Sequence, residues 1–351
     1  MTRTTQKDVA KVLGVSAMTV SNAFNRPDQL SSDLRQRVLD RATKMGYSGP
    51  DAIARHLRSG KTNTYAVVFE EDLSYAFSDP FSVAWLTAFA EAMQHHRASI
   101  MILSARADEP ESLKAIQDAA VDGVAGLCGN QPAIAAARGR GLPTVYCSMS
   151  EWPDADGDYV VIDDYAAGYD IGAHLHRLGH RRVVVVHEAM YPGQSVLTEQ
   201  PVEDFARALE KHRYGFYPTL HRTRGIVDGL AGANVSVVVT AANTRDSGRR
   251  VGAAILDRKD RPTAVVGVSD VLALGVMDAC AQRRLVPGSD ISVAGFDDVP
   301  EAIAAGLTTI RQPIRDKGRI AAELLLDPER PERRITLPHE LIVRSSTRPV
   351  A

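Results

Sequence analysis

The segment DVAKVLGVSAMTVSNAF, residues 8–24, has the residue types and the spacing needed to read DNA. Small Ala10 lets two helices approach closely, Gly14 permits a tight turn, and apolar Val20 holds the second helix in place. In this helix-turn-helix arrangement the second helix presents its N-terminal residues to the major groove. The chemistry expected here is recognition through hydrogen bonds and apolar contacts.

The distribution of charge supports this interpretation. Residues 1–61 contain eleven lysines and arginines against five aspartates, a net charge of +6, whereas the rest of the chain has 30 basic and 38 acidic residues. A basic N-terminal segment on an acidic remainder indicates that only the former contacts a polyanion. On charge alone, a solvated helical surface remains the alternative.

Catalytic motifs are not recognisable in the sequence. GVAGLCG at 123–129 has the spacing G-x-x-G-x-x-G, which is not the dinucleotide fingerprint, and neither a Walker loop nor a G-x-S-x-G elbow is present. The pairs Asp163–Asp164 and Asp297–Asp298 lack a partner acid or nucleophile in a known motif. We therefore predict a protein that is not an enzyme and needs no cofactor.

Three nearby histidines, His174, His176 and His180, raise the question of a metal site. Gly179 should end their helix and take His180 off the face of His176, and no cysteine or carboxylate motif completes a coordination set. Histidines placed favourably against the helix dipole are the better explanation. No metal is predicted.

The remaining composition indicates a cytoplasmic protein of two or three domains. A chain of 351 residues is too long for one small module. Met1–Lys7 contains no apolar signal region, and no apolar stretch approaches the roughly 18 residues of a membrane helix. Cys128, Cys147 and Cys280 are far apart and match no zinc spacing, as expected of reduced thiols.

The elements that position the recognition residues can be predicted from caps and periodicity. The N-terminal segment reads as three short helices, at residues 6–13, 16–24 and 31–46. Thr5 is expected to cap the first, Ser16 the second, and Ser31 or Ser32 the third, which Gly46 ends. The three helices share one minimal core.

From Thr64 onward the pattern changes to apolar strands that alternate with helices. Continuous apolar strands of this kind indicate parallel sheets covered on both faces, with ligands in crevices at the strand ends. The expected strands are 64–69, 99–103, 123–127, 144–147, 159–162, 183–186, 235–240, 264–268 and 291–296. Two such series predict two similar lobes with a cleft.

The ordered motifs of the chain resemble those of the LacI/GalR (lactose-repressor) family of bacterial transcription regulators. The resemblance begins with TQKDVAKVLGVSAMTVSNAFN and LSSDLRQRVLDRATKMGYSGPDAIARHLRSGKT. It continues through DPF at 79–81, VDGVAGL at 121–127, HLHRLGHRRV at 174–183, SDVLALG at 269–275, DISVAGFDD at 290–298, LTTIRQP at 307–313 and ELIVRSST at 340–347. It spans essentially the whole chain.

The resemblance implies a recognition helix at residues 16–25. The positions that read base edges in relatives fall on Ala17, Met18 and Asn22. Asn22 could pair with adenine, and the other two offer apolar contact. Many relatives have arginine where Asn22 stands, so their operators should not be carried over. Phosphate-contacting positions fall on Thr5, Ser16, Thr19, Ser21, Asn25, Ser31 and Tyr47. Helix capping is the alternative role of the hydroxyls, and one side chain can serve both roles.

Between Pro50 and Gly60, the stretch DAIARHLRS resembles the family's hinge helix, which forms only when two copies pack over the minor groove. So short a helix is marginal in water by itself. Leu57 then matches the leucine wedged between base pairs, with Ala54 and Arg58 as groove and phosphate contacts. An ordinary polar linker is the alternative.

The resemblance implies three parts: a helix-turn-helix domain at 1–48, a hinge at 49–61, and a core at 62–351 for effector binding and dimerisation. The core should have the two-lobed α/β fold of periplasmic binding proteins, and its chain should cross between lobes three times. We expect an N-lobe at about 62–162 and 291–320, and a C-lobe at about 163–290 and 321–351.

In the cleft, the resemblance places effector contacts at Asp79, Phe81, Ser82 and Asp270. Asp270 would accept hydrogen bonds from effector hydroxyls, commonly those of a sugar or nucleoside-like compound. Helix capping by Asp270 and core packing of Phe81 are the alternatives. In PVEDFARAL, Pro201 stands where most relatives have an effector-binding arginine, so an atypical or cationic effector becomes a candidate.

The function predicted is that of a homodimeric transcription regulator, a repressor, which binds a palindromic operator under the control of a small molecule. Two-fold symmetry requires half-sites about one helical turn apart. The chain ends soon after ELIVRSST without a heptad tail, which favours a dimer over a tetramer. The alternatives are an effector-independent DNA binder and a solute-binding protein. No membrane partner is predicted.

Overall fold

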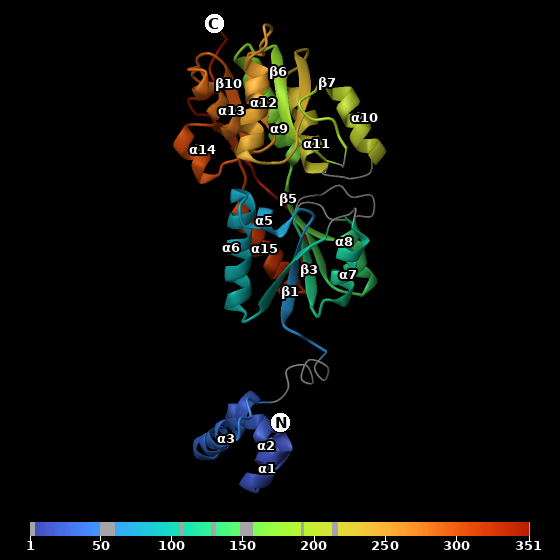
Figure 1. The fold of residues 1–351 in the computed structure, drawn as a ribbon, viewed down its shortest axis with the longest axis vertical. Helices are drawn as coiled ribbons and strands as arrows, with labels where there is room; N and C mark the ends of the chain where they lie inside the picture. The colour runs from blue at the N-terminus through green and yellow to red at the C-terminus, as the bar shows by residue number, and fades with distance from the viewer. Residues whose placement is uncertain are drawn as a thin grey trace. The chain divides into compact units, whose positions relative to one another are not determined.

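The computed structural model describes residues 4–49, 60–105, 109–127, 131–147, 157–190, 193–212 and 217–350. The chain divides into two compact units, residues 1–62 and 63–351 (Figure 1). The predicted hinge contacts Ala54, Leu57 and Arg58 lie outside the described residues. Among the helices that are described, none is long and apolar enough to cross a membrane.

The first unit contains three α-helices and a short 3-10 helix: α1 (Gln6–Leu13), α2 (Ala17–Asn25), η1 (Pro27–Gln29) and α3 (Ser32–Lys44). The three predicted helices are confirmed. Gly14 ends α1 with φ of +67°, a left-handed conformation that glycine adopts without strain. The core is formed by small and β-branched side chains, Val9, Ala10, Val20, Ala23, Val38, Ala42, with Tyr47.

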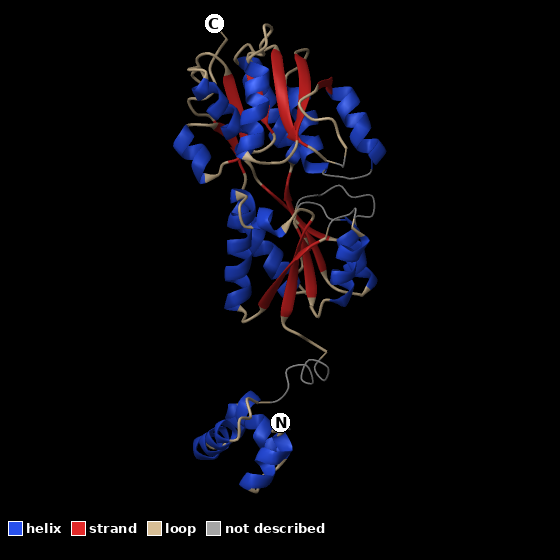
Figure 2. Ribbon diagram, viewed as in Figure 1, coloured by secondary structure: helices blue, strands red, loops and turns tan. Residues whose placement is uncertain are grey.

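The second unit contains two sheets flanked by helices (Figure 2). In the described residues the first sheet has the order β12-β5-β4-β3-β1-β2, with parallel pairings throughout. Its strands are β1 (Thr64–Phe69), β2 (Ser99–Ser104), β3 (Gly123–Gly126), β4 (Thr144–Tyr146), β5 (Asp158–Ile162) and β12 (Arg334–Leu337). Its helices are α5 (Leu73–Ala76), α6 (Pro80–His95), α7 (Pro110–Asp118), α8 (Gln131–Gly139) and α15 (Ile314–Leu326).

The second sheet has the order β13-β11-β10-β9-β6-β8-β7, and its edge strands β13 and β7 are antiparallel to their neighbours. Its strands are β6 (Arg182–Glu188), β7 (Glu199–Pro201), β8 (Asn234–Thr240), β9 (Ala264–Gly267), β10 (Ser292–Asp297), β11 (Thr308–Arg311) and β13 (Glu340–Ile342). Its helices are α9 (Asp164–Arg177), α10 (Val202–His212), α11 (Tyr217–Gly229), α12 (Arg245–Leu256), α13 (Asp270–Gln282) and α14 (Pro300–Ala305).

Helices α9 and α11 approach so closely that only glycine fits between them. A Cβ atom on Gly168 of α9 would lie 2.1 Å from the carbonyl oxygen of Arg222 on α11. This close approach brings the Arg222 side chain to Asp164, at the start of α9. The glycine thereby helps to position a charged pair.

The lobe boundaries expected from the sequence differ from the observed sheets. Residues 291–311, expected in the N-lobe, form β10 and β11 of the second sheet, while β12, expected in the C-lobe, joins the first sheet beside β5. The reason is that β9 and β10, joined through α13, pair directly in parallel register. The described chain passes between the sheets after β5, after β11 and after β12.

Candidate functional site

The start of α2 carries the polar residues predicted to face DNA. Ser16 is the N-cap: its Oγ accepts a hydrogen bond from the Thr19 amide at 3.0 Å and lies 2.9 Å from the Thr19 hydroxyl. Met18 is exposed, with 68% of its surface accessible, and Ala17 is half-buried. The capping role expected for Ser16 is therefore confirmed, and the exposed Met18 offers an apolar contact.

Asn22 is oriented by a neighbour that the sequence did not indicate. Its Nδ2 donates to Oε1 of Gln29 in η1 at 3.1 Å, and Asn25 Nδ2 donates to the Ser21 hydroxyl at 3.3 Å. An amide nitrogen has two protons, so Asn22 still has one donor and its Oδ1 acceptor to offer an adenine. Gln29 thus pre-orients the side chain predicted to read a base.

Thr5 and Ser31 also act as N-caps, of α1 and α3 respectively. Tyr47, predicted to contact phosphate, lies in the core of the first unit and packs edge-on against Phe24, with ring centroids 5.7 Å apart. Its hydroxyl is buried and has no hydrogen-bond partner among the residues described, and burial raises its pKa. In this conformation the Tyr47 hydroxyl does not face solvent.

In the second unit, Asp79 is the N-cap of α6 and its Oδ2 accepts a hydrogen bond from the Ser82 amide at 2.8 Å. Burial raises the pKa of Asp79. The Ser82 side chain is fully buried, whereas Phe81 is half-buried with the Lys317 ammonium 5.4 Å from its ring centroid. These three predicted effector residues therefore lie together at the start of one helix.

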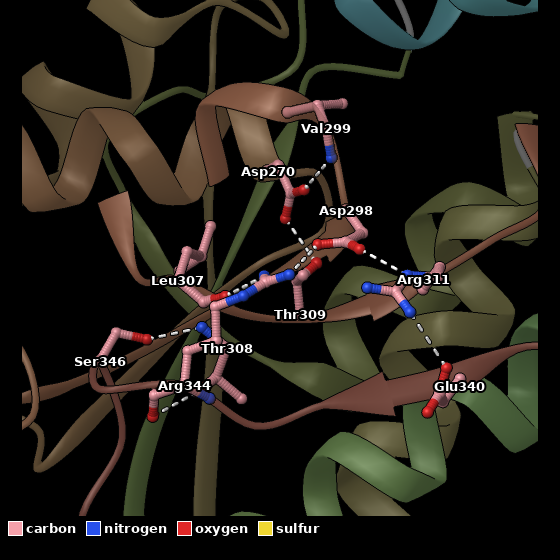
Figure 3. A network of polar contacts seen from close by, with 10 residues as sticks. All are labelled: Asp270, Asp298, Val299, Leu307, Thr308, Thr309, Arg311, Glu340, Arg344 and Ser346. Carbon is pink, nitrogen blue, oxygen red and sulfur yellow. Dashed lines mark hydrogen bonds and ion pairs between the residues drawn. The ribbon is translucent and has the colours of Figure 1, made fainter. Parts of the chain in front are cut away.

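Asp270 is fully buried at the start of α13, and both its oxygens have protein partners (Figure 3). Its Oδ1 accepts from the Thr309 hydroxyl at 2.6 Å, and its Oδ2 accepts from the Val299 amide at 3.0 Å. Burial raises its pKa to about 6. The carboxylate that was predicted to bind effector hydroxyls here joins α13 to β11 and to the start of α14.

The neighbouring Asp298 forms the centre of the polar network drawn in Figure 3. It accepts from Arg311 Nε at 2.7 Å and from Arg344 Nη2 at 2.6 Å, while Arg344 also donates to the Leu307 carbonyl. Arg311 in turn contacts Glu340 of β13 at 3.3 Å. This network fastens the C-terminal segment to the second sheet.

Two chains of hydrogen bonds connect the layers of the two sheets, and the sequence indicated neither. In the first, Lys317 of α15 donates to Gln312 Oε1 at 3.2 Å, and Gln312 Nε2 donates to Asp297 at the end of β10. In the second, Asn243 Nδ2 donates to the Tyr75 hydroxyl of α5 at 2.8 Å and accepts from Ser269 at 2.6 Å. Polar residues at strand ends thus link the two sheets.

Arg222 is a further residue that sequence reasoning missed. Its Nε donates to Asp164 Oδ1 at 2.7 Å and its Nη1 to the Val268 carbonyl at 2.8 Å, while its guanidinium carbon lies 3.8 Å from the Phe296 ring centroid. Both charged side chains are nearly buried. Arg222 belongs to no recognisable sequence motif. Only the folded structure brings its side chain next to Asp164 and Phe296.

The three histidines considered for a metal have protein partners. His174 Nε2 lies 2.9 Å from the Thr347 hydroxyl, His176 Nδ1 donates to the Leu230 carbonyl, and His180 contacts Thr263 and the Arg348 carbonyl. Burial lowers the pKa of His174 and of His180. Within the described residues, no group of three potential ligands is arranged to hold a metal ion.

Comparison with known proteins finds a family match in each of the two units. Residues 5–49 match the family described as bacterial regulatory proteins, lacI family, and residues 173–347 match a periplasmic binding protein-like domain. An HTH-type transcriptional regulator of Mycobacterium tuberculosis is 34% identical over 338 residues, covering 93% of this chain and 92% of the relative.

Solved structures share the same fold. A transcriptional regulator CelR–cellobiose complex is 25% identical, with a TM-score of 0.66, over 98% of this chain and 100% of that one. The lac repressor dimer bound to operator and the anti-inducer ONPF has a TM-score of 0.76 at 21% identity, over 99% of this chain and 100% of that one.

A helix-turn-helix unit followed by a periplasmic-binding-protein-like core defines the class: a transcriptional regulator with an effector-binding core. Because the mycobacterial relative is 34% identical and matched over nearly its whole length, this chain belongs to the lacI family of bacterial regulatory proteins.

Proposed function

We propose that this protein is a homodimeric repressor that binds palindromic operator DNA through α2 of each subunit and responds to a small effector held between the two sheets of the core. It would act in the cytoplasm, where its DNA is, and would catalyse no reaction. The lac repressor, whose fold it shares, has been solved as a dimer on its operator.

The observation that carries the proposal is the geometry of α2. Its start is capped by Ser16, it exposes Met18, and it holds Asn22 through Gln29. The residues around it give the segment 1–61 a net charge of +6, which supplies the salt-dependent attraction to phosphate. Capping, exposure and charge together suit a helix that enters the major groove.

Effector control would act as a shift of population between two core arrangements. An effector that binds one arrangement more tightly favours that arrangement and changes operator affinity by the same coupling free energy. The residues proposed to contact it are Asp79, Phe81 and Ser82, and Asp270 would act by holding the surrounding loops. The proposed hinge residues Ala54, Leu57 and Arg58 would transmit the change to DNA.

The test is selection from randomised oligonucleotides with the full chain, at two salt concentrations. We expect enrichment of a palindrome and affinity that falls as salt rises. Asn22→Ala should lose about 1–3 kcal/mol of discrimination at one base pair of each half-site while keeping non-specific affinity. Thr43→Ala, on the exposed surface of α3, is the matched control and should keep the wild-type preference. Failure to enrich any palindrome contradicts the proposal.

An effector-independent DNA binder is the second candidate, favoured by one observation. Pro201, the last residue of β7, takes the position where the family resemblance implies an effector-binding arginine, so that expected contact is absent. Operator affinity that no small molecule changes would support this second function.

A further inference from the structure

Three carboxylates gather where strands of both sheets end. Glu71 follows β1, Asp79 begins α6, and Glu188 is the last residue of β6. Glu71 lies close enough to both Asp79 and Glu188 for their charges to interact. The first two belong to the layer of the first sheet and Glu188 to the second, so the group spans both sheets.

Two of these carboxylates have an oxygen that the protein leaves unsatisfied. Oε2 of Glu71 and Oε2 of Glu188 are buried, and neither has a hydrogen-bond partner among the described residues. Asp79, in contrast, accepts from the Ser82 amide and from Tyr75. Buried carboxylate oxygens without donors are costly, so a site with two of them is built for a donor from outside the protein.

Two basic side chains of the core, Arg222 and Lys317, make their hydrogen bonds to other partners. Arg222 pairs with Asp164 and donates to the Val268 carbonyl, and Lys317 donates to Gln312. Burial lowers the pKa of Lys317 and so disfavours its charged form. Asp297 adds a further buried carboxyl whose pKa burial raises well above its ordinary value. The charge of Arg222 interacts with Glu188, but its hydrogen bonds go to Asp164 and Val268, and the buried oxygens of Glu71 and Glu188 stay without a donor among the described residues.

The pKa of Glu71 also indicates that negative charge in this group is poorly compensated. Burial, together with the neighbouring charges of Glu70, Glu188 and Asp79, raises the pKa of Glu71 to about 8. A neutral ligand donates hydrogen bonds to a carboxylate but leaves its charge uncompensated. A cation offsets the charge and donates hydrogen bonds at once, which makes it the better partner for a buried group of this kind.

His187 adds a second kind of acceptor beside Glu188. Its Nδ1 donates to the Glu188 carbonyl at 2.8 Å and lies 3.9 Å from Glu188 Oε2, so its other nitrogen, Nε2, is an acceptor in the neutral ring. The His187 side chain is fully buried, and Nε2 has no partner among the residues that the structure describes. The buried acceptors near Glu188 thus match a ligand rich in N–H donors.

We propose that the effector carries a protonated nitrogen, as in an amine or amidine, which binds between Glu71 and Glu188. This inference rests on the proposed function and names the chemical class of the effector. Because the two carboxylates come from different sheets, the cation would attract both and favour the arrangement in which they are close. Without the cation, Glu71 holds a proton near neutral pH and nothing draws the two side chains together, so the charge of the ligand would itself drive the population shift.

The test compares amines with neutral partners of similar shape on the full chain. Binding of glucosamine against glucose, and of ethanolamine against ethylene glycol, is measured by calorimetry and by the shift in melting temperature. We expect at least one amine to bind at least about tenfold more tightly than its neutral partner. Glu71→Gln and Glu188→Gln should each weaken that binding about tenfold or more. Glu203→Gln, exposed on α10, should not change it.

Equal binding of amine and neutral partner, no binding of either amine, or full amine binding by both glutamine variants overturns the inference. Circular dichroism and operator binding by the same variants show whether they are folded, which keeps loss of the fold apart from loss of the site. Operator binding also separates the two claims. If the wild type selects a palindrome but shows no preference for amines, the inference fails and the proposed function stands.

Discussion

The two units hold their functional side chains in opposite ways. In the first unit, Thr5, Ser16 and Ser31 each bond to a backbone amide three residues ahead. In the second unit the decisive partners are remote: Arg222 and Asp164 are 58 residues apart, and Asn243 and Tyr75 are 168 apart. The first arrangement can be read from neighbouring letters of the sequence, whereas the second exists only once the sheets have formed.

The two units also differ in how far their ion pairs are exposed to solvent, and therefore in the free energy lost when one partner is removed. Arg37 and Asp33 of α3 form an exposed pair at 4.0 Å, which solvent screens. Arg222 and Asp164 form a pair at 2.7 Å that is nearly buried. Removing one partner of a buried pair leaves the other charge without compensation, so the same substitution should have very different consequences in the two units.

The largest effect expected is that of Arg222→Met compared with Arg37→Met. The first should lower the free energy of unfolding of the core by about 3–5 kcal/mol, because Asp164 loses its counter-charge. The second should cost about 0–1 kcal/mol. Both tryptophans, Trp85 and Trp152, lie in the second unit, so tryptophan fluorescence during urea unfolding measures the loss in Arg222→Met. The first unit has no tryptophan, so hydrogen exchange of the α3 amides measures the loss in Arg37→Met. Equal, small losses would show that the core pair is as screened as the surface pair.

A comparable effect, present only at high pH, is expected from Glu71→Gln. The pKa of Glu71 is about 8 in the folded protein against an ordinary 4.5, so the unfolded chain loses this proton first. Wild-type stability relative to the variant should therefore be unchanged below about pH 4.5, fall between pH 4.5 and 8, and stay low above. By pH 9 the variant should gain up to about 5 kcal/mol on the wild type, the free energy that corresponds to a pKa displaced from 4.5 to about 8.

The measurement is urea unfolding of both proteins across this pH range, with Glu203→Gln on the exposed face of α10 as the matched control. A difference between wild type and Glu71→Gln that does not grow with pH contradicts a buried, uncompensated carboxyl at Glu71. A bound cation should reduce the difference, since it stabilises the ionised carboxylate of the wild type alone.

This contrast explains what the sequence could predict. The three helices of the first unit and the caps Ser16 and Ser31 follow from local spacing, and the apolar strands of the core follow from runs such as VVVV at 183–186. The assignment of β10 and β12 to their sheets did not follow, because strand pairing depends on crossover geometry rather than on local pattern.

The candidate sites show the same division. The exposure of Met18 on α2 fits local reasoning, but the support of Asn22 by Gln29 depends on how η1 packs. The motif around Asp270 predicts an effector contact, whereas its two oxygens accept from Thr309 and Val299, which lie 39 and 29 residues away. A motif identifies the residue type, and only the fold determines what its side chain contacts.

The smallest effect is expected from removing a helix cap in the first unit, where the stabilising contacts are local in sequence. Ser31→Ala removes the hydroxyl that accepts from the Leu34 amide at 3.3 Å, whereas Ser32, the first residue of α3, is exposed and is not the cap. Losing the cap should cost about 1 kcal/mol, and Ser32→Ala should stay within about 0.5 kcal/mol. Hydrogen exchange of the α3 amides in the full chain measures this local stability directly.

Because Ser31 is also a proposed phosphate contact, its variant should bind all DNA more weakly by a similar factor, without change in sequence preference. Equal exchange in the two alanine variants would mean that packing on Val38 and Ala42, rather than the cap, sets the stability of α3, and that the first unit depends on distant contacts as much as the core does.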